Sequence, residues 1–425
     1  MNVAAPAVEQ VALKPRALPR ALIPTADALA LGLLLYLFLR LWFDRHVLFD
    51  RPAAVVAGVG LAAAIAARAP LRSFLDWPLL AYSALTVLSI AAGWNASASA
   101  GGRLPWQPAL HAIILPAYFY AATWILRTRV RIALILVILV VAVGLAGVEA
   151  AYDHVAAGID TRLVGYPSTA PWMAYPDLAL LFALALPVPL ALFIVARSKI
   201  VVYAAAVMAV VFWVDQILLY SRSGYLSALS AFLAVAAVEI VSVRRARLLA
   251  VLVPCLAIIA FGVATSGSVN QLFRDLGGSY VYESRFGIWH RTLAMIGDHP
   301  LLGVGPGNYV AVMRSGYEWR TWFHVDDLHA HNMLLHVAAE SGIPAAVAFL
   351  LIWAGLFRRL WLSATSPGPP CAVTIGVFGA LVAFFVRCLT DHFMSGLPIS
   401  DRVAFLLWTL IAAGVAATRL PEGAR

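Results

Sequence analysis

Apolar blocks of about 17 to 24 residues alternate along the chain with short segments that contain charged residues, proline or glycine. Blocks of this length suit a hydrocarbon core that is ~30 Å thick, and a backbone inside lipid must form its own hydrogen bonds as a helix. We therefore predict about twelve transmembrane helices. Their expected positions are residues 24–43, 52–67, 74–93, 108–126, 130–151, 172–195, 200–220, 224–241, 248–265, 333–357, 372–393 and 403–418.

The predicted fold is thus an all-α integral membrane protein in three parts. Residues 1–265 contain predicted helices 1 to 9 with short loops, and residues 333–425 contain predicted helices 10 to 12. Residues 266–332 form one large loop, which is far longer than ordinary connections between helices. Because loops of this size commonly carry function, we expect the chemistry of the protein in or beside this loop.

The composition supports a membrane protein. Hydrophobic residues make up 63% of the chain and charged residues only 12%, whereas soluble domains contain roughly 45–50% apolar residues. The formal net charge is +9, but the basic residues are spread over short loops instead of forming one patch, so we predict no nucleic-acid partner. Cys255 and Cys388 lie in apolar blocks and Cys371 in a proline-rich loop, which predicts neither a disulfide framework nor a zinc site.

The basic residues of the short loops also predict the orientation of the helices. The helix assignment puts about 17 Lys and Arg residues on one face of the membrane and about 6 in the short loops of the other face, so the first face is cytoplasmic. An even number of spans then places both termini in the cytoplasm and the large loop outside it. Lys14, Arg16 and Arg20 precede an apolar block that runs to Phe43, and we expect this block to remain as the first span instead of being a cleaved signal peptide.

Within the large loop, the segment ESRFGIWHRTLAMIGDHP predicts an amphipathic helix. Phe286, Trp289, Leu293 and Ile296 recur at spacings of three and four and share one stripe, so this helix is suited to lying flat on the membrane surface. The glycines and the proline of the following LLGVGPGNY predict a turn before a second short helical stretch.

Three histidines occur close together in the segment LHAHNMLLHVAAESGIP. If the chain is helical from about His329 to Glu340, His329 and His336 lie roughly 10 Å apart along the helix axis. His331 then lies about 200° around the helix from His329, so we do not expect the three histidines to hold one metal ion. Asp326 and Asp327 become candidate ligands only if the chain before His331 is not helical.

The three histidines differ in the chemistry that their positions predict. For His329 and His336, a hydrogen bond between helices or contact with interfacial water is the ordinary interpretation. His331 lies where the large loop meets a membrane helix, and it is followed by Asn332 and by a helix that we expect Gly342 to close. An imidazole at this depth can accept a proton near pH 7, which makes His331 a candidate general base.

Two arginines on the same predicted face are candidates for binding an anion. Arg222 interrupts two apolar blocks in LLYSRSGYLSAL, and Arg285 lies in the predicted amphipathic helix. The alternatives are a topology anchor for Arg222 and a headgroup-facing charge for Arg285. A pair of guanidinium groups can grip a phosphate or diphosphate with bidentate geometry, which indicates a polyanionic lipid ligand.

Asp391 and His392 end the predicted span 372–393 on this face, where a solvated helix end is the alternative interpretation. Arg40 and Arg387 lie inside apolar blocks near the same face, and snorkelling of the side chain to the membrane surface is sufficient to explain both. Arg387 remains a secondary candidate for the site.

Three segments resemble the signature segments of the O-antigen ligase and polymerase superfamily. They are SRSGYLSAL, SRFGIWHRTLAMIGDHPLLGVGPGNY and HNMLLHVAAESGIP. The family pattern of His, then Asn or Ser, nine residues and Gly is met by His331, Asn332 and Gly342. The two functional arginines of the family fall on Arg222 and Arg285.

The resemblance implies a type C glycosyltransferase-like membrane fold with no cofactor. It implies transfer of a glycan from undecaprenyl diphosphate to a sugar hydroxyl of lipid A-core, at the periplasmic face of the bacterial inner membrane. His331 is expected to act as the base and Arg222 and Arg285 to stabilise the leaving diphosphate. The expected substrate-binding residues are Arg222, Arg285, Asn332, Asp391, His392 and Arg387. Many lipid-linked glycosyltransferases hold a metal ion on paired acids in the first outer loop, but DRHVLFD contains only Asp44 and Asp50 and no DxD motif, so we expect no metal.

Several other functions are open at this level. Polymerases of the same superfamily have a similar plan. Protein O-oligosaccharyltransferases carry a Gly-Thr pair and a further Gly after the histidine helix, whereas here Gly342 is followed by Ile343 and Pro344. A transporter of lipid-linked glycans, or a non-catalytic assembly partner, would use the same arginines without transferring a sugar, although the chain shows no internal repeat of the kind many transporters have.

Overall fold

We describe the protein from a computed structural model of the whole chain. The described residues are 23–43, 50–99, 106–157, 175–219, 221–241, 287–317, 329–366, 371–390 and 398–420. Every regular element among them is a helix. In chain order these are α1 (Ile23–Phe43), α2 (Asp50–Ala66), α3 (Asp76–Ser99), α4 (Trp106–Ile125), α5 (Arg129–Ala157), α6 (Tyr175–Ala185), α7 (Pro187–Val195), α8 (Lys199–Leu218), α9 (Arg222–Val241), α12 (Gly287–Asp298), α13 (Tyr309–Gly316), α14 (Met333–Ala364), α15 (Ala372–Cys388) and α16 (Pro398–Ala417).

The predicted all-α fold is confirmed for the described residues, and their apolar helices support the prediction of a membrane protein. Within the described part of the chain, five stretches are long and apolar enough to cross a membrane: Arg129–Asp153, Leu178–Val195, Lys199–Leu218, Ser223–Val241 and Met333–Ala364. Shorter apolar helices coincide with four further predicted spans, at Ala53–Ala66, Ile114–Ile125, Ala372–Cys388 and Arg402–Ala417. The predicted span 248–265 and most of the large loop lie outside the described residues. The number of crossings and their orientation therefore stay predictions.

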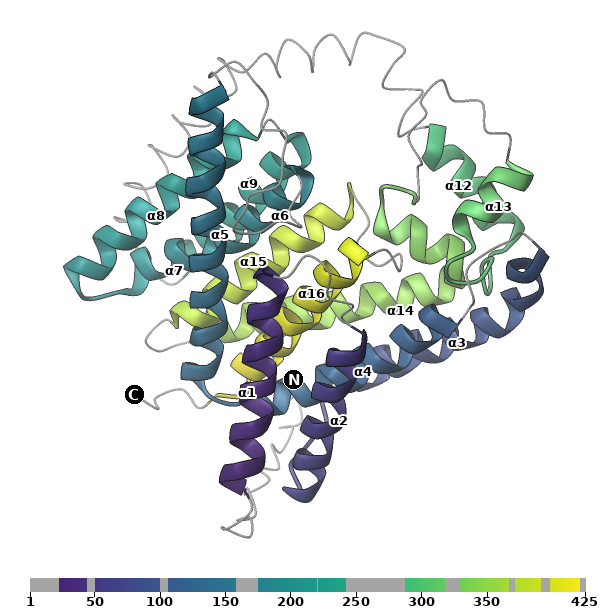
Figure 1. Cartoon of the computed structure of the whole chain (residues 1–425), viewed down its shortest axis with the longest axis horizontal. Coiled ribbons are helices and arrows are strands. Elements are labelled where there is room, and N and C mark those ends of the chain that lie inside the picture. Colours follow the sequence, from purple (N-terminus) through teal and green to yellow (C-terminus); the bar gives the residue numbers. More distant parts are fainter. Residues whose placement is uncertain are drawn as a thin grey trace, which may run out of the picture.

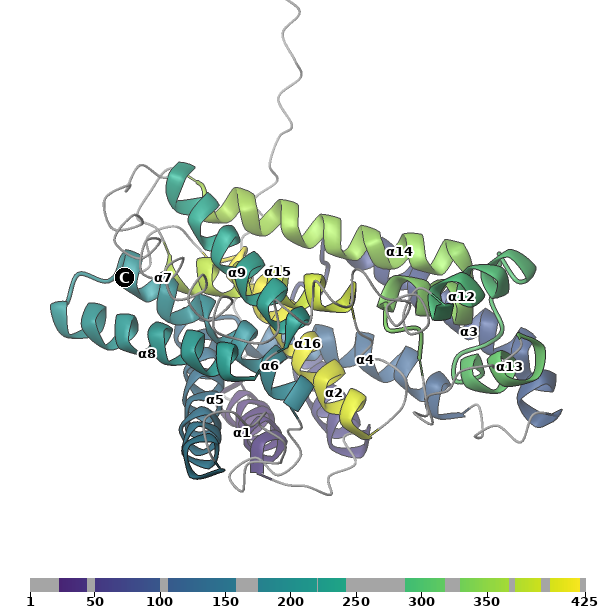
Figure 2. The same ribbon diagram turned by 90° about the horizontal axis from the view of Figure 1, so that it is seen from above.

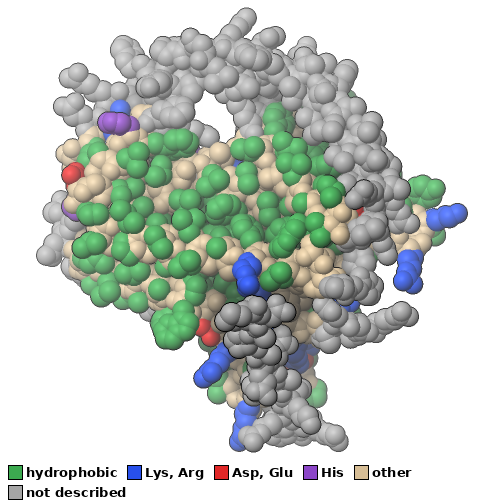
Figure 3. Space-filling model, turned by 180° about the vertical axis from the view of Figure 1, so that it is seen from behind, with side chains coloured by type: hydrophobic (Ala, Val, Ile, Leu, Met, Phe, Trp, Pro, Cys, Tyr) green, Lys and Arg blue, Asp and Glu red, His purple; other side chains and the backbone are tan. Residues whose placement is uncertain are grey.

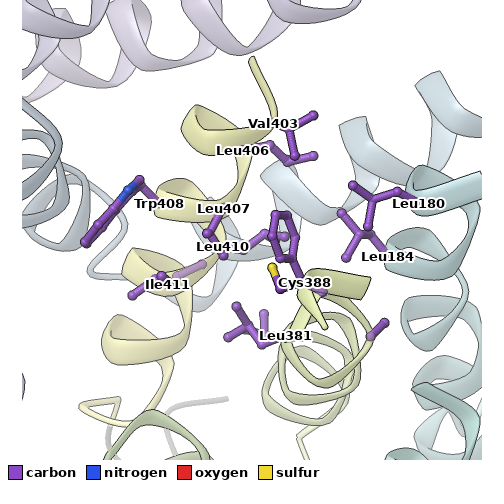
Figure 4. Packing of buried hydrophobic residues seen from close by; sticks show 14 of the residues in the cluster. Leu180, Leu184, Leu381, Cys388, Val403, Leu406, Leu407, Trp408, Leu410 and Ile411 are labelled. Atoms are coloured by element: carbon purple, nitrogen blue, oxygen red, sulfur yellow. The ribbon is translucent and has the colours of Figure 1, made fainter. Parts of the chain in front are cut away.

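The helices form two groups with α15 and α16 between them. Helices α5 to α9 lie on one side, and α2, α3, α4, α12 and α13 lie on the other (Figure 1, Figure 2). Helix α15 packs against α6, α7, α9, α14 and α16, and α14 runs along α3. Leu180 and Leu184 of α6 face Leu381 and Cys388 of α15 and the apolar side of α16 (Figure 4). The core is thus continuous across the helices that surround α15.

The outer surface is apolar over broad areas, as a bilayer requires. Figure 3 shows one face that is almost entirely hydrophobic, with Lys and Arg side chains mainly at its edges. Large apolar side chains are exposed on several helices, including Ile200 at 80% and Val130 at 77%. Such a surface is unfavourable in water but matches lipid chains, which supports the membrane prediction.

The span predicted as one helix over 172–195 is divided into α6 and α7. The division follows from Pro187, which has no N–H and whose ring disfavours a straight helix. The backbone nevertheless continues, because Leu186 N donates to Phe182 O at 2.9 Å and Leu190 N donates to Leu186 O at 3.3 Å. Helices α6 and α7 therefore form one continuous apolar segment that is interrupted locally at Pro187.

A charged cluster joins α1, α4 and α5 at the end that the sequence predicts to be cytoplasmic. Arg127 Nη2 donates to Asp27 Oδ2 at 2.7 Å, and Arg131 donates to both carboxylate oxygens of Asp27 at 2.6 and 2.8 Å. We call Asp27, Arg127 and Arg131 the Asp27 cluster. Its bidentate geometry fixes the start of α1 against the start of α5.

Candidate functional site

The segment before α14 forms a turn instead of a helix. We call residues 329–332 the His331 turn. The chain is not helical from His329, and α14 begins at Met333, where the predicted span 333–357 also begins. Asn332 caps this helix: it has extended backbone angles (φ −158°, ψ 115°) and its side chain accepts hydrogen bonds from the N–H groups of Leu334 and Leu335. Asparagine at such an N-cap satisfies backbone donors that the first turn of a helix leaves free.

His331 has a left-handed backbone, with φ at +48°. This conformation costs a residue with a side chain roughly 1–2 kcal/mol and persists only where the surroundings fix it. The turn brings His329 and His331 together, with their ring centroids 4.3 Å apart and His331 N donating to His329 Nδ1 at 3.3 Å. The separation of about 200° was expected only for a helical segment, so it does not apply to this turn. Both side chains are half-buried.

Asn332 also connects the turn to the end of α15. Its Nδ2 donates to the backbone oxygen of Leu389 at 3.1 Å. Arg387 lies two residues earlier in the last turn of α15, and only 1% of it is exposed. The snorkelling interpretation was wrong for Arg387, because neighbouring helices cover the side chain. For Arg40 snorkelling stays a prediction; the side chain is half-exposed and lies over the Tyr36 ring at 5.6 Å.

The start of α9 lies at the same end of the bundle. Helix α6–α7 runs antiparallel to α15, because Val188 contacts Gly376 and Pro187 contacts Gly379. Gly224, in the first turn of α9, contacts Ala179 of α6. Ala179 therefore lies nearer than Pro187 to the end of α15 that carries Arg387. The start of α9, which contacts Ala179, lies at this end too.

The structure thus brings three predicted elements to one end of the bundle: the His331 turn with Asn332, the end of α15 with Arg387, and the start of α9, whose first residue is Arg222. The side chain of Arg222 and all of Arg285, Asp391 and His392 lie outside the described residues. Asp391 directly follows the described end of the α15 segment at Thr390.

Helix α14 is interrupted at Gly342, where φ is +87° and ψ is +164°. This confirms that Gly342 closes the first part of the helix. Pro344 has no N–H to donate back to Glu340, and the N–H of Ile343 donates to Pro300 O at 2.8 Å. The carbonyl groups of Ala339 and Glu340 are consequently left without the helical donors that would normally face them.

A loop fills this gap. We call residues 301–308 the glycine loop; it confirms the turn predicted for LLGVGPGNY, and α13 is the predicted second helix. Val304 N donates to Ala339 O and Gly305 N donates to Glu340 O, both at 2.9 Å. Gly303 has a φ of +65° and lies so close to the Glu340 backbone that a Cβ atom would overlap it. Only glycine permits both the conformation and the approach.

Helix α3 holds the glycine loop from the opposite side. Ser89 Oγ donates to Glu340 O at 2.7 Å, and Asn308 Nδ2 donates to Gly93 O at 3.3 Å. A Cβ atom at Gly93 would lie 2.8 Å from Gly305 Cα, so the contact requires glycine there too. The loop is therefore enclosed between α3 and the kink of α14.

Helix α12 confirms the predicted amphipathic helix, and the membrane contact of its predicted apolar stripe stays a prediction. Its buried residues are Ile288, Thr292, Met295 and Ile296, whereas Leu293 of the predicted stripe is 55% exposed. The helix packs against α14, and Trp289 Nε1 donates to Ala330 O at 2.9 Å. Tertiary contacts with α14 select the buried face, and they fix the residue before His331.

Several polar residues of this end were not singled out from the sequence. Glu340 lies in an apolar helix and is buried, and Asp215 and Gln216 are buried in the last turns of α8, where Gln216 contacts Gly224. An ionisable residue within an apolar run is a functional signal in membrane proteins, so Glu340 and Asp215 were detectable. Ser89 and Gly93 gave no signal, because their partners lie far away in the sequence.

Among the residues that the structure describes, no group of three or more His, Cys, Asp or Glu side chains lies close enough to hold a metal ion. The candidate ligands Asp326 and Asp327 lie outside those residues.

The fold and the site define the class of protein. It is a multi-pass helical membrane protein in which a tightly held histidine turn lies at one end of the bundle, beside a buried arginine and a glycine loop.

Residues 207–350, roughly a third of the chain, match the family model described as O-antigen ligase. This match supports the resemblance to the O-antigen ligase and polymerase superfamily that the signature segments indicated. Members of this family are glycosyltransferase-like enzymes that act on lipid-linked glycans in a bilayer. A search of curated proteins found no match to this chain.

Proposed function

We propose that this protein is an O-antigen ligase of the bacterial inner membrane. It transfers the O-antigen polysaccharide from undecaprenyl diphosphate to a sugar hydroxyl of lipid A-core at the periplasmic face, and so completes lipopolysaccharide. The observation that carries the proposal is the His331 turn: a half-exposed, conformationally fixed imidazole lies beside the end of α15 with Arg387, at the end of the bundle where α9 begins with Arg222.

The proposed chemistry is a single displacement. The acceptor hydroxyl oxygen forms a bond to the anomeric carbon while the bond from that carbon to the diphosphate oxygen breaks. His331 takes the hydroxyl proton, and the electron pair leaves with undecaprenyl diphosphate. Attack opposite the leaving group inverts the anomeric configuration. A positioned general base typically contributes about 10²- to 10⁴-fold to such a step.

The arginines are proposed to stabilise the departing diphosphate. Arg222 and Arg285 supply planar donor forks that match phosphate oxygens, and the buried Arg387 adds positive potential at the same end. Charge that develops in a site shielded from water is stabilised strongly by fixed cationic groups. Asp391 and His392 are proposed to bind the sugars, and Asn332 contributes by fixing the turn through Leu389.

The reaction is proposed to need no metal ion, because the sequence offers no paired acids in the first outer loop and the arginines can neutralise the diphosphate. We expect full activity of purified protein after incubation with EDTA. Activity that collapses in EDTA and returns with Mg²⁺ or Mn²⁺ would contradict this part of the proposal.

The deciding experiment compares lipopolysaccharide from a ligase-deleted strain that carries wild-type protein, His331→Ala or His290→Ala. His290 is the matched control, since it is an exposed histidine of α12. We expect wild type and His290→Ala to restore the ladder of long chains and His331→Ala to leave lipid A-core unmodified at equal membrane abundance.

Other outcomes identify the other functions. Lengthening of the lipid-linked donor, with unmodified lipid A-core, would assign the protein as a polymerase of the same superfamily. Glycan attached to protein would assign an O-oligosaccharyltransferase, and movement of the donor across the bilayer without transfer would assign a transporter. Equal ladders from wild type and His331→Ala would remove His331 as the base.

A further inference from the structure

His336 is placed to act on the His331 turn without reaching the substrate itself. It lies in the first turns of α14, is only 2% exposed, and packs its ring against that of Tyr309 at a centroid distance of 4.8 Å. Its Nδ1 accepts a hydrogen bond from Ala330 N at 3.4 Å. Because Nδ1 is the acceptor, the neutral ring carries its proton on Nε2.

Glu340 lies one helical turn further along, against the protonated side of this ring. Its Oε2 is 3.3 Å from His336 Nε2. Its other oxygen, Oε1, accepts hydrogen bonds from Gly307 N at 2.9 Å and Tyr309 N at 3.3 Å. A carboxylate that faces the N–H of an imidazole fixes both the tautomer and the ring orientation.

These contacts form one chain across the end of the bundle. They run from the glycine loop to Glu340, from Glu340 to His336, and from His336 to the N–H of Ala330. The carbonyl group of Ala330 is held separately by Trp289 of α12 at 2.9 Å. Both polar groups of the residue before His331 are therefore fixed, which explains how the left-handed backbone of His331 persists.

We propose that His336 and Glu340 are positioning residues for the general base. They hold the backbone of the His331 turn and thereby the direction of the His331 imidazole toward the acceptor hydroxyl. This inference rests on the proposed role of His331 in glycosyl transfer. The inference gives a reason for Glu340, a buried carboxylate that packing of the apolar helix α14 does not require.

Substitution of a positioning residue is expected to lower kcat and to leave KM unchanged. A base that is displaced by about 1 Å slows the chemical step by up to about 100-fold, while the surfaces that bind the two lipids stay unchanged. Loss of a packing contact alone would instead lower thermal stability and active fraction, and would leave kcat per folded molecule unaltered.

Two substitutions at His336 separate its hydrogen bond to Ala330 N from its contact with Glu340. Asparagine can place its side-chain oxygen near the position of Nδ1 and so keeps the acceptor for Ala330 N, whereas glutamine places its amide near the position of Nε2 and keeps the donor for Glu340. We expect His336→Asn to retain kcat within about threefold and His336→Gln to lose about 10- to 100-fold, both with unchanged KM.

Glu340→Gln tests the same chain from its other end. The glutamine oxygen can still accept from Gly307 N, but its amide N–H₂ faces His336 Nε2–H. The imidazole relieves this repulsion by moving its proton to Nδ1, where it opposes the N–H of Ala330. We expect a kcat loss of about tenfold in the wild-type background and little further loss in the His336→Asn background.

The measurement is a steady-state transfer assay with purified protein, lipid-linked donor and lipid A-core, with folded fraction determined by thermal unfolding. Equal kcat in His336→Asn and His336→Gln, or additive effects of His336→Asn and Glu340→Gln, would overturn the inference. If His336→Gln does not fold, the comparison of Glu340→Gln in the two backgrounds decides.

Folded wild-type protein that transfers no glycan would instead overturn the proposed function. Transfer by wild type but not by His331→Ala, together with wild-type kcat in the His336 variants, would overturn this inference alone.

Discussion

The Asp27 cluster and the His331 turn are both polar sites at helix starts, but their polar groups are held in different ways. In the Asp27 cluster, one carboxylate receives two guanidinium groups, so charge is neutralised by charge. In the His331 turn, the contacts run mainly between side chains and backbone groups of Ala330, His331, Leu334 and Leu389. The first arrangement joins helices, whereas the second fixes the conformation of one residue and leaves its imidazole half-exposed.

Among the substitutions that test this comparison, His331→Ala is expected to have the largest effect, because it removes the imidazole. We expect the rate of transfer to fall by about 10²- to 10⁴-fold, because the variant lacks the imidazole proposed to take the acceptor proton. The melting temperature should stay near that of wild type, since the ring lies at the surface of the turn. Single-turnover rates with purified protein check this, and a rate within threefold of wild type would remove His331 from the mechanism.

Arg222→Lys has the next largest expected effect. Lysine keeps the positive charge but cannot present two parallel N–H groups to a diphosphate. We expect a rate loss of about 10- to 100-fold, which corresponds to one or two charge-assisted hydrogen bonds. The same transfer assay measures it, and a wild-type rate would show that Arg222 serves only to anchor the topology.

Gly342→Ala should act on stability through the kink that supports the His331 turn. The φ of +87° disfavours any side chain, and a Cβ atom would overlap the Leu301 carbonyl group. We expect a loss of at least about 2 kcal/mol in the free energy of unfolding, measured in detergent. Gly32→Ala in α1 is the matched control, because nothing lies within 4 Å of its Cβ position. Equal melting temperatures for the two variants would contradict the strained kink.

Asp27→Asn removes the carboxylate of the other site. The variant leaves Arg127 and Arg131 close together without their shared anion, and we expect a loss of about 1–2 kcal/mol in stability. The value of kcat should not change, because this cluster takes no part in transfer. A fall in kcat that is larger than the fall in folded fraction would break the distinction between the two sites.

The smallest expected effect concerns the end of α13. The Tyr317 hydroxyl donates to Asp298 Oδ2 at 2.6 Å, and burial together with this carboxylate raises the pKa of Tyr317 to about 12. Because the folded-state pKa lies above the ordinary value of 10.0, the contact stabilises fully below about pH 10 and is lost as pH rises toward 12. Subtracting the phenolate absorbance titration of Tyr317→Phe from that of wild type isolates this group. A midpoint near 10 would contradict the contact.

The sequence was informative where lipid dictates the pattern. Apolar length alone located helices such as α8 and α9 to within a few residues, because each must satisfy its own backbone in the membrane. It also located Gly342 as a stop, since glycine followed by Pro344 cannot continue a helix. The candidate base and the two partner elements came from the signature segments and were placed at one end by the fold.

The sequence was less informative where tertiary contacts decide. The sequence left open whether the chain is helical before Met333. The structure has a turn there, because Asn332 caps α14 and Ala330 is held by Trp289 and His336. Helix α12 also buries Ile288 and Met295, which lie outside the predicted stripe, because it packs against α14. Arg387 was covered by neighbouring helices that a one-dimensional pattern does not reveal.

The kink at Gly342 has a consequence for the order in which this end of the protein assembles. Residues 300–305 precede α14 in the chain, and their N–H and C=O groups form the hydrogen bonds that the helix lacks where Pro344 interrupts it. The backbone hydrogen bonds at the kink of α14 join two chain segments. The amide groups of one segment therefore become protected from solvent only when the other segment is in place. Amide protons of Val304, Gly305 and Ile343 should exchange with solvent as one cooperative unit.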